Sequence, residues 1–211
     1  MMKFKILPVT HYQQNCSLIW CNTTKQAALI DPGGEAARLL REVDELGLKL
    51  EMVLLTHGHV DHVAAASQIA EQRQVPIIGP HEADAFWLEI LPQHAEKLGF
   101  PPTDSFTPNR WLKDEETIQL GTLHLRVRHT PGHTPGHVIF YSHVGNTVFV
   151  GDVLFQGSIG RTDFPQGDHA TLIDSINRHL LSMDDDVTVV PGHGPTTTIG
   201  EERRHNPFLQ G

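Results

Sequence analysis

The chain has few cysteines and no long apolar run. Among its 211 residues only Cys16 and Cys21 are cysteines, and both lie beside the apolar run 17–20, as strand residues rather than a disulfide framework do. No Cys-x-x-Cys pair is present, so a metal site has to use nitrogen and oxygen ligands. No apolar run approaches the roughly 20 residues of a membrane span, and the first residues lack the apolar core of a signal peptide. We therefore expect no membrane partner and a cytoplasmic location.

Basic residues are also scarce. The chain has 16 Lys and Arg against 25 Asp and Glu, a formal net charge of −9. This balance disfavours nucleic acid as a partner, because phosphate binding depends on a basic surface. The chain is 39% hydrophobic and 19% charged, which is enough for a packed core. Its length predicts a single domain over residues 1–211.

Histidine, in contrast, is abundant, with 15 in the chain. The stretch Thr56-His57-Gly58-His59-Val60-Asp61-His62 directly follows an apolar run, 52–55, that is typical of a buried strand. In α/β proteins such strand ends carry binding sites, and imidazole and carboxylate at this density indicate metal coordination. Because alternate residues of an extended segment point the same way, His57, His59 and Asp61 are expected to converge while His62 faces a second point.

The hydrophobic pattern predicts strands and helices in two similar halves, 1–80 and 117–195. The expected strands are 3–7, 17–20, 27–30, 52–55, 76–79, 117–120, 123–129, 138–141, 147–150 and 187–190. The expected helices are 35–46, 63–70, 82–91 and 169–181. Such an arrangement indicates two packed sheets that are covered on the outside by helices.

Three more candidate ligands follow strands of the second half. His133 comes after the strand 123–129, Asp152 after 147–150, and His193 after 187–190. Each has glycine beside it, as expected where the backbone turns sharply or approaches another segment closely. Together with the first cluster they indicate one metal site built from distant segments. His137, four residues after His133, is interpreted as a supporting residue behind the ligands.

At this point the sequence resembles the metallo-β-lactamase-fold hydrolases. That family has T-H-x-H-x-D-H followed by a distant His, an Asp and a final His, in the order found here over about residues 15–195. The run T-P-G-H-T-P-G-H (130–137), together with 151–155 and 191–195, is most similar to glyoxalase II, which hydrolyses S-2-hydroxyacylglutathione thioesters. The resemblance implies an α/β fold, the four-layer αββα sandwich, in a short form that lacks the C-terminal helical domain of longer glyoxalase II enzymes.

The resemblance also implies two divalent metal ions per chain, Zn²⁺ in the first place, with Fe²⁺ or Mn²⁺ as alternatives. The implied ligands are His57, His59 and His133 for the first metal; Asp61, His62 and His193 for the second; and Asp152 as a bridge. The expected nucleophile is a hydroxide between the metals, with Asp61 and Asp152 as catalytic residues. It would hydrolyse a thioester such as S-lactoylglutathione to glutathione and a 2-hydroxy acid, a reaction of methylglyoxal detoxification. The departing thiolate needs no general acid.

Arg161 is the candidate for substrate binding. It lies nine residues after Asp152, where glyoxalase II has a basic residue that holds a glutathione carboxylate. The alternative interpretation is an Arg161 that pairs with Asp163 or Asp168 and only shapes the loop. Since longer glyoxalase II enzymes use their helical domain for further glutathione contacts, Arg203 or Arg204 would have to substitute here.

Other functions compete with thioester hydrolysis. Persulfide dioxygenases of the same fold are mononuclear iron enzymes and share a run much like Gly160-Arg161-Thr162-Asp163-Phe164. A lactonase uses the same ligand set. The commonest zinc β-lactamases have Cys at the position of Asp152 and lack His62, and the net charge disfavours a nuclease. A non-enzymatic metal-binding module would bind metal tightly without turnover.

Overall fold

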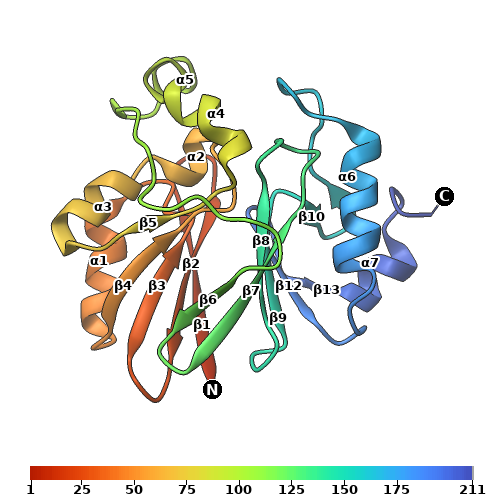
Figure 1. The fold of residues 1–211 in the computed structure, drawn as a ribbon, viewed down its shortest axis with the longest axis horizontal. Coiled ribbons are helices and arrows are strands. Elements are labelled where there is room, and N and C mark those ends of the chain that lie inside the picture. The colour runs from red at the N-terminus through yellow and green to blue at the C-terminus, as the bar shows by residue number, and fades with distance from the viewer. Residues whose placement is uncertain (211) are drawn as a thin grey trace.

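In a computed structural model that describes residues 1–210, two sheets face each other and helices cover their outer faces (Figure 1). The first sheet has the order β1-β2-β3-β4-β5. Its strands are β1 Met2–Val9, β2 Gln14–Cys21, β3 Gln26–Ile30, β4 Lys49–Leu54 and β5 Ile77–Ile78. The second sheet has the order β13-β12-β9-β8-β7-β6. Its strands are β6 Thr117–Leu120, β7 Leu123–His129, β8 Val138–Ser142, β9 Thr147–Gly151, β12 Thr188–Pro191 and β13 Thr197–Thr198.

Helices form the two outer layers. The first sheet is covered by α1 Ala36–Glu45 and α3 Ala66–Arg73, and the second by α6 His169–Ser175, its π-helical continuation η2 Ile176–Leu180 and α7 Ile199–His205. The remaining helices are the short α2 Val60–Val63, the 3-10 turn η1 Glu82–Asp84, α4 Ala85–Glu89 and α5 Leu91–Leu98. The predicted αββα sandwich is confirmed.

The alternation of apolar side chains along each strand builds this layering. On β2, Leu18 is buried in the core under α1 and α3, whereas the next residue, Ile19, is buried between the sheets. Phe140 of β8 and Phe149 of β9 fill the core between the sheets from the other side. Strands that are apolar on both faces therefore require the helices outside as well as the second sheet inside.

Several parts of the fold differ from the sequence prediction, which also lacked β13 and α7. The expected helix 82–91 is divided into η1, α4 and α5, and α5, with Pro92 in its first turn, continues to Leu98. The expected helix 63–70 is preceded by the separate turn α2. A small hairpin of β10 Leu154–Phe155 and β11 Ser158–Ile159 was not predicted. No helix among residues 1–210 has the length and apolar character that crossing a bilayer requires.

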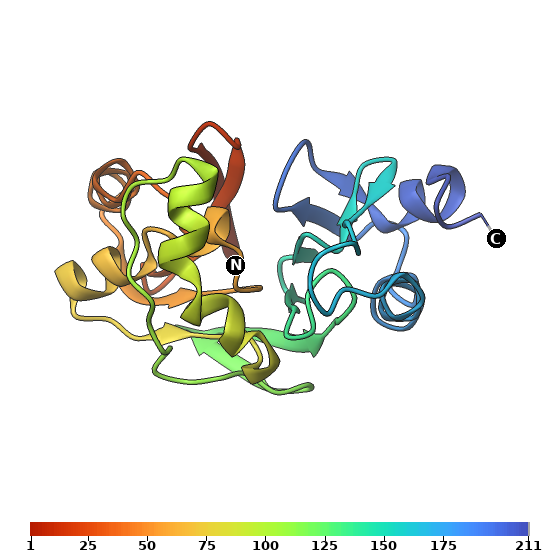
Figure 2. The same cartoon turned by 90° about the horizontal axis from the view of Figure 1, so that it is seen from above.

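The topology places the candidate ligands at one edge of the sandwich. β7 and β8 are antiparallel, β8 and β9 are antiparallel, and β9 and β12 are parallel, so β7, β9 and β12 end at the same edge. The first sheet meets them there, because Val138 N donates to Thr56 O at 2.8 Å and Gln14 forms a β-bridge with His193. Figure 2 looks onto this edge, with the yellow-green helices α4 and α5 on the N-terminal half.

Candidate metal centre

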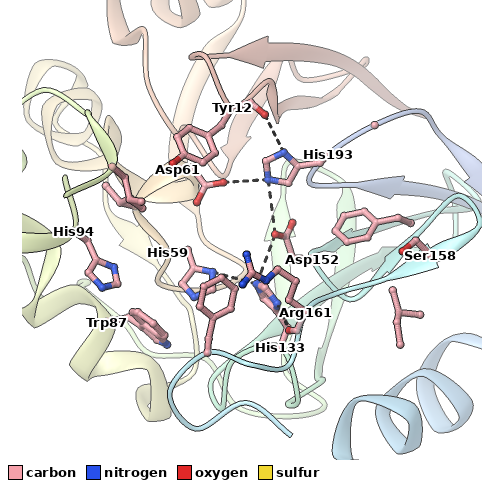
Figure 3. A pocket seen from close by; sticks show the side chains of 16 residues that line it. Tyr12, His59, Asp61, Trp87, His94, His133, Asp152, Ser158, Arg161 and His193 are labelled. Atoms are coloured by element: carbon pink, nitrogen blue, oxygen red, sulfur yellow. Dashed lines mark hydrogen bonds and ion pairs between the residues drawn. The ribbon is translucent and has the colours of Figure 1, made fainter. Parts of the chain in front are cut away.

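The seven predicted ligands come together in two groups with Asp152 between them. His57, His59 and His133 form the first group, and Asp61, His62 and His193 form the second; within each, the candidate ligand atoms all lie within 4.8 Å of one another. Figure 3 shows His59, Asp61, His133, Asp152 and His193 around one cavity. The role of these residues as metal ligands stays a prediction, but the fold provides the convergence that this role requires.

In the first group three ring nitrogens face one another. His59 Nδ1 lies 3.1 Å from His57 Nε2 and 3.1 Å from His133 Nε2. The other ring nitrogen of His133, Nδ1, donates to the backbone oxygen of Arg161 at 2.8 Å, which leaves a free lone pair on Nε2. His57 Nδ1 lies 2.9 Å from Thr56 Oγ1. Acceptors behind His57 and His133 thus direct the basic nitrogens of these two rings inward, as in metal sites.

The second group repeats this arrangement with carboxylates. His62 Nδ1 donates to Asp31 Oδ2 at 2.9 Å, and His193 Nδ1 donates to the backbone oxygen of Tyr12 at 3.2 Å. Both rings therefore present Nε2 to the interior. His193 Nε2 faces Asp61 Oδ2 at 3.0 Å, so that a lone pair meets a carboxylate oxygen unless a cation or a proton lies between them.

Asp152 lies between the groups. Its Oδ1 is 3.3 Å from His62 Nε2, and its Oδ2 is 3.6 Å from His133 Nε2 and 3.8 Å from His193 Nε2. Its backbone N–H donates to His137 Nε2 at 3.1 Å. His137 is thus a supporting residue, as the sequence indicated.

The donors fit divalent cations. Burial, and next the positive charge of neighbouring histidines, lowers the pKa of His57 and brings that of His59 to about 3, so both rings are neutral, the form that binds metal. Burial also lowers the pKa of His62, but Asp152 and Asp61 outweigh it and raise this pKa well above its usual value. His62 Nε2 and Asp152 Oδ1 are buried and have no hydrogen-bond partner among the described residues. Since orphaned buried polar atoms are costly, this pocket requires positive charge.

Asp61 corrects one step of the sequence reasoning. Strand-like alternation predicts that it converges with His57 and His59, but its ligand atom groups with His62 and His193. The reason is that the backbone is extended only to His59, and α2 begins at Val60. In a helical turn successive side chains are about 100° apart rather than opposite, so strand alternation no longer applies to Asp61 and His62.

Sequence reasoning also missed Asp84, which is fully buried behind the first group. Its Oδ2 accepts from Gly58 N at 2.9 Å and from Thr134 Oγ1 at 2.8 Å, and its Oδ1 accepts from Gly136 N at 2.6 Å. Asp84 thereby connects the loop of His57 and His59 to the loop of His133. No local signal marks it, because its partners are 26 to 52 residues away.

We expect Asp84→Asn to change the pH dependence of stability. Burial raises the pKa of Asp84 from its usual 3.8 to about 6. Between these two pH values the folded protein therefore keeps a proton on this carboxyl, whereas the unfolded chain releases it. The contribution of this carboxyl to the free energy of unfolding is therefore full below pH 4 and falls as the pH rises toward 6. In urea titrations of metal-free protein, the stability of the wild type relative to the variant should be about 2 kcal/mol greater at pH 4.5 than at pH 7. An equal difference at both pH values would contradict this.

Arg161 lies at the wall of the cavity, but its guanidinium is paired. Nε and Nη2 donate to the two oxygens of Asp163 at 2.9 and 2.7 Å, and the guanidinium carbon lies 4.6 Å from the centre of the Phe164 ring. The pairing with Asp163 is the one that the alternative interpretation anticipated. The side chain is 68% exposed, so the pair is open to exchange with a substrate carboxylate. A glutathione contact by Arg161 stays a prediction.

Arg203 and Arg204 do not line this cavity. Both bind Asp185, and Arg203 also donates to the backbone oxygens of Leu181 and Met183 at 2.7 Å. Their side chains attach α7 to the segment before β12. The idea that they substitute for glutathione contacts of a helical domain is therefore wrong for this arrangement of the chain.

The cavity over the two groups has a volume of about 560 Å³. Its wall includes His59, Asp61, His133, Asp152 and His193, so both groups open into it (Figure 3). The other lining residues are mainly apolar or aromatic: Tyr12, Val60, Trp87, His94, Leu98, Phe155, Ser158, Ile159, Arg161, Phe164 and Gly194. A concave apolar chamber with a few convergent polar groups is the usual form of a small-molecule site.

Comparison with known proteins agrees with this geometry. The profile of the Metallo-beta-lactamase superfamily matches residues 9–193. The chain belongs to this superfamily. Among curated relatives of this metallo-β-lactamase-fold protein, the Haemophilus influenzae protein named Hydroxyacylglutathione hydrolase GloC is 53% identical over 209 residues, 99% of this chain and 98% of the relative. The predicted resemblance to a short, glyoxalase II-like hydrolase is confirmed.

Solved structures of the superfamily match over nearly the whole chain. The BLEG-1 B3 metallo-beta-lactamase has a TM-score of 0.92 and 38% identity, covering 99% of this chain and 100% of its own. TTHA1623 in a di-iron-bound form has a TM-score of 0.89 and 38% identity; the match covers 97% of this chain and 100% of TTHA1623. ETHE1 from Myxococcus xanthus has a TM-score of 0.80 and 31% identity; the match covers 97% of this chain and 83% of ETHE1. The His and Asp groups, together with the superfamily match and the di-iron-bound neighbour, support bound divalent metal.

Proposed function

We propose that this enzyme is a metal-dependent thioester hydrolase that cleaves S-2-hydroxyacylglutathione, such as S-lactoylglutathione, into glutathione and a 2-hydroxy acid. The observation that carries the proposal is the pair of ligand groups on either side of Asp152, which open into a cavity of about 560 Å³, a size suited to a small molecule. The relative named hydroxyacylglutathione hydrolase, 53% identical over the full length, supports the substrate class.

Two divalent cations held by these groups would supply Lewis acidity, both to activate water and to polarise the thioester carbonyl. Zn²⁺ is the proposed metal because five imidazoles and two carboxylates suit it, and the di-iron neighbour keeps iron as an alternative.

The residues of the chain orient the reactants. Asp61 lies on the cavity wall, and its carboxylate can accept the proton of the attacking water. Water oxygen then bonds to the carbonyl carbon, the carbon–sulfur bond breaks, and the thiol leaves as a thiolate without a donor from the protein. Arg161 at the wall is the proposed partner of a glutathione carboxylate, in exchange for Asp163.

The proposal predicts that metal removal abolishes thioester hydrolysis. Metal-free protein should cleave S-lactoylglutathione at least about a hundredfold more slowly than protein with two equivalents of Zn²⁺, because water activation is lost. The loss of thioester absorbance measures the rate, and elemental analysis measures the metal. Iron- and manganese-loaded protein in the same assay identifies the productive metal.

The control for this experiment is His124→Ala, an exposed histidine of β7 outside the cavity. It should keep both the metal content and the rate. Fully loaded protein that hydrolyses no thioester would contradict the proposed function, and tight metal binding without any turnover would favour a metal-binding module.

The second candidate is a persulfide dioxygenase with one iron per chain. It is favoured by the run Gly160-Arg161-Thr162-Asp163-Phe164, which resembles a run of the persulfide dioxygenases. Oxygen uptake by iron-loaded protein on glutathione persulfide, without thioester hydrolysis, would decide for it.

A further inference from the structure

One corner of the cavity is formed by two aromatic rings. The Trp87 indole and the Phe164 ring are 6.1 Å apart between centroids and nearly perpendicular, at 88°. Trp87 comes from α4 and is almost fully buried, whereas Phe164 comes from the loop after β11 and is half-buried. Figure 3 shows Trp87 beside His59 on the same side of the cavity. The chain thus builds one apolar wall of the cavity from two distant segments.

This aromatic corner lies directly on the first ligand group. The Trp87 and Phe164 rings are 4.5 and 4.7 Å from the His59 ring, and Phe164 is 5.6 Å from the His133 ring. A carbonyl carbon between the two ligand groups would therefore hold its substituent within contact distance of one or both rings. Phe155 lies on the opposite side, 6.4 Å from the His193 ring.

Charged groups are few around the corner. Apart from the histidines and carboxylates of the ligand groups, Arg161 is the one fully charged side chain of the cavity wall, and its guanidinium stacks on the Phe164 ring and binds Asp163. This pair closes the outer side of Phe164. The inner side offers ring faces and edges, which favour apolar or aromatic groups.

We infer that the corner of Trp87 and Phe164 is the acyl subsite and that it selects 2-hydroxyacyl thioesters with a large apolar or aromatic substituent. The inference rests on the proposed function and specifies its substrate class. A lactoyl group offers this apolar wall only a methyl, whereas the phenyl of a mandeloyl group would cover the accessible part of the Phe164 ring. Apolar contacts of this size change specificity by about tenfold or more.

The experiment compares S-mandeloylglutathione with S-lactoylglutathione on the metal-loaded enzyme, each kcat/KM divided by the alkaline hydrolysis rate of that thioester. The wild type should favour the mandeloyl substrate by about tenfold or more. Phe164→Ala should bring this ratio close to one, mainly by slowing the mandeloyl reaction, while Phe164→Leu should keep part of the preference. Metal content and thermal unfolding of each variant establish that it is folded and loaded.

Phe155→Ala is the matched control, since it removes a ring of the same size from the opposite wall. Phe155→Ala should change kcat/KM for both substrates by the same factor. A wild-type ratio near one, or a ratio that collapses in Phe155→Ala but not in Phe164→Ala, would overturn the acyl subsite while thioester hydrolysis stands. Hydrolysis of neither thioester would instead reject the proposed function.

Discussion

Replacing Asp152 with alanine is expected to lower kcat/KM for thioester hydrolysis by well over a hundredfold and to leave the protein without a full pair of metals. Asp152 is the one carboxylate whose oxygens lie near both groups, 3.3 Å from His62 Nε2 and 3.6 Å from His133 Nε2. Burial raises its pKa, but His62 outweighs burial and lowers that pKa below its usual range, so Asp152 is charged. Changes behind the ligands alone cost 10- to 100-fold, and a shared ligand should cost more.

The measurements are elemental analysis and the S-lactoylglutathione assay on the same preparation. Asp104→Ala is the control, because Asp104 is exposed, lies outside the cavity and makes no ion pair in the part of the chain that the structure describes. Full turnover and full metal content in Asp152→Ala would refute the bridging role.

Asp31→Ala should weaken metal binding at the second group by about 10- to 100-fold without removing a proposed ligand. Asp31 Oδ2 accepts from His62 Nδ1 at 2.9 Å and from Thr56 Oγ1 at 2.6 Å, while Oδ1 accepts from Thr56 N at 2.8 Å. Without this carboxylate His62 Nδ1 loses the acceptor that fixes the tautomer presenting Nε2 to the metal, and the amide of Gln14, 3.5 Å away, does not replace it because its Nε2 is a donor. Buried donors would also lose their partner, at a cost of about 1–3 kcal/mol each.

Zn²⁺ titration against a competing chelator measures the affinity, and urea unfolding of metal-free protein measures the stability. Asp31→Asn is the conservative comparison, because asparagine tolerates the left-handed backbone at this position, φ 52°, and keeps one acceptor oxygen. Asp31→Asn should have a Zn²⁺ affinity and a free energy of unfolding that lie between those of the wild type and of Asp31→Ala. Reduced stability with unchanged affinity would limit Asp31 to a structural role.

Local sequence features predicted most of the fold. The apolar runs of β2, β3, β4 and β9 lie in strands because their residues are buried on both faces, and α1 follows the apolar spacing of Ala36, Leu39, Leu40 and Val43. Glycine beside a ligand also had the expected meaning at Gly192, where a Cβ atom would overlap Asp152 and His62. Close packing of backbone against the site explains why glycine is needed there.

The local sequence did not predict which distant residues contact one another. Asp31 follows β3 and precedes Pro32 and Gly33, a pattern typical of a turn, whereas its role depends on His62, 31 residues away. Asp84 likewise has no partner nearby in the sequence. The split of the expected helix 82–91 into α4 and α5 puts Trp87 against His59, a contact that periodicity does not encode.

The sequence by itself determined the chemistry of the donors: five histidines and two aspartates at strand ends, with no cysteine among them, which resemble a metallo-β-lactamase-fold site. The family resemblance already implied that Asp61 groups with His62 and His193, as the structure has it, although strand alternation alone did not. Only the tertiary structure decided the buried acceptors Asp31 and Asp84 behind the ligand groups and the aromatic wall of the cavity. The physical reason is that donor types are local properties of a chain. The direction of a ring nitrogen, and the surface that meets a substrate, depend on how distant strands and helices pack.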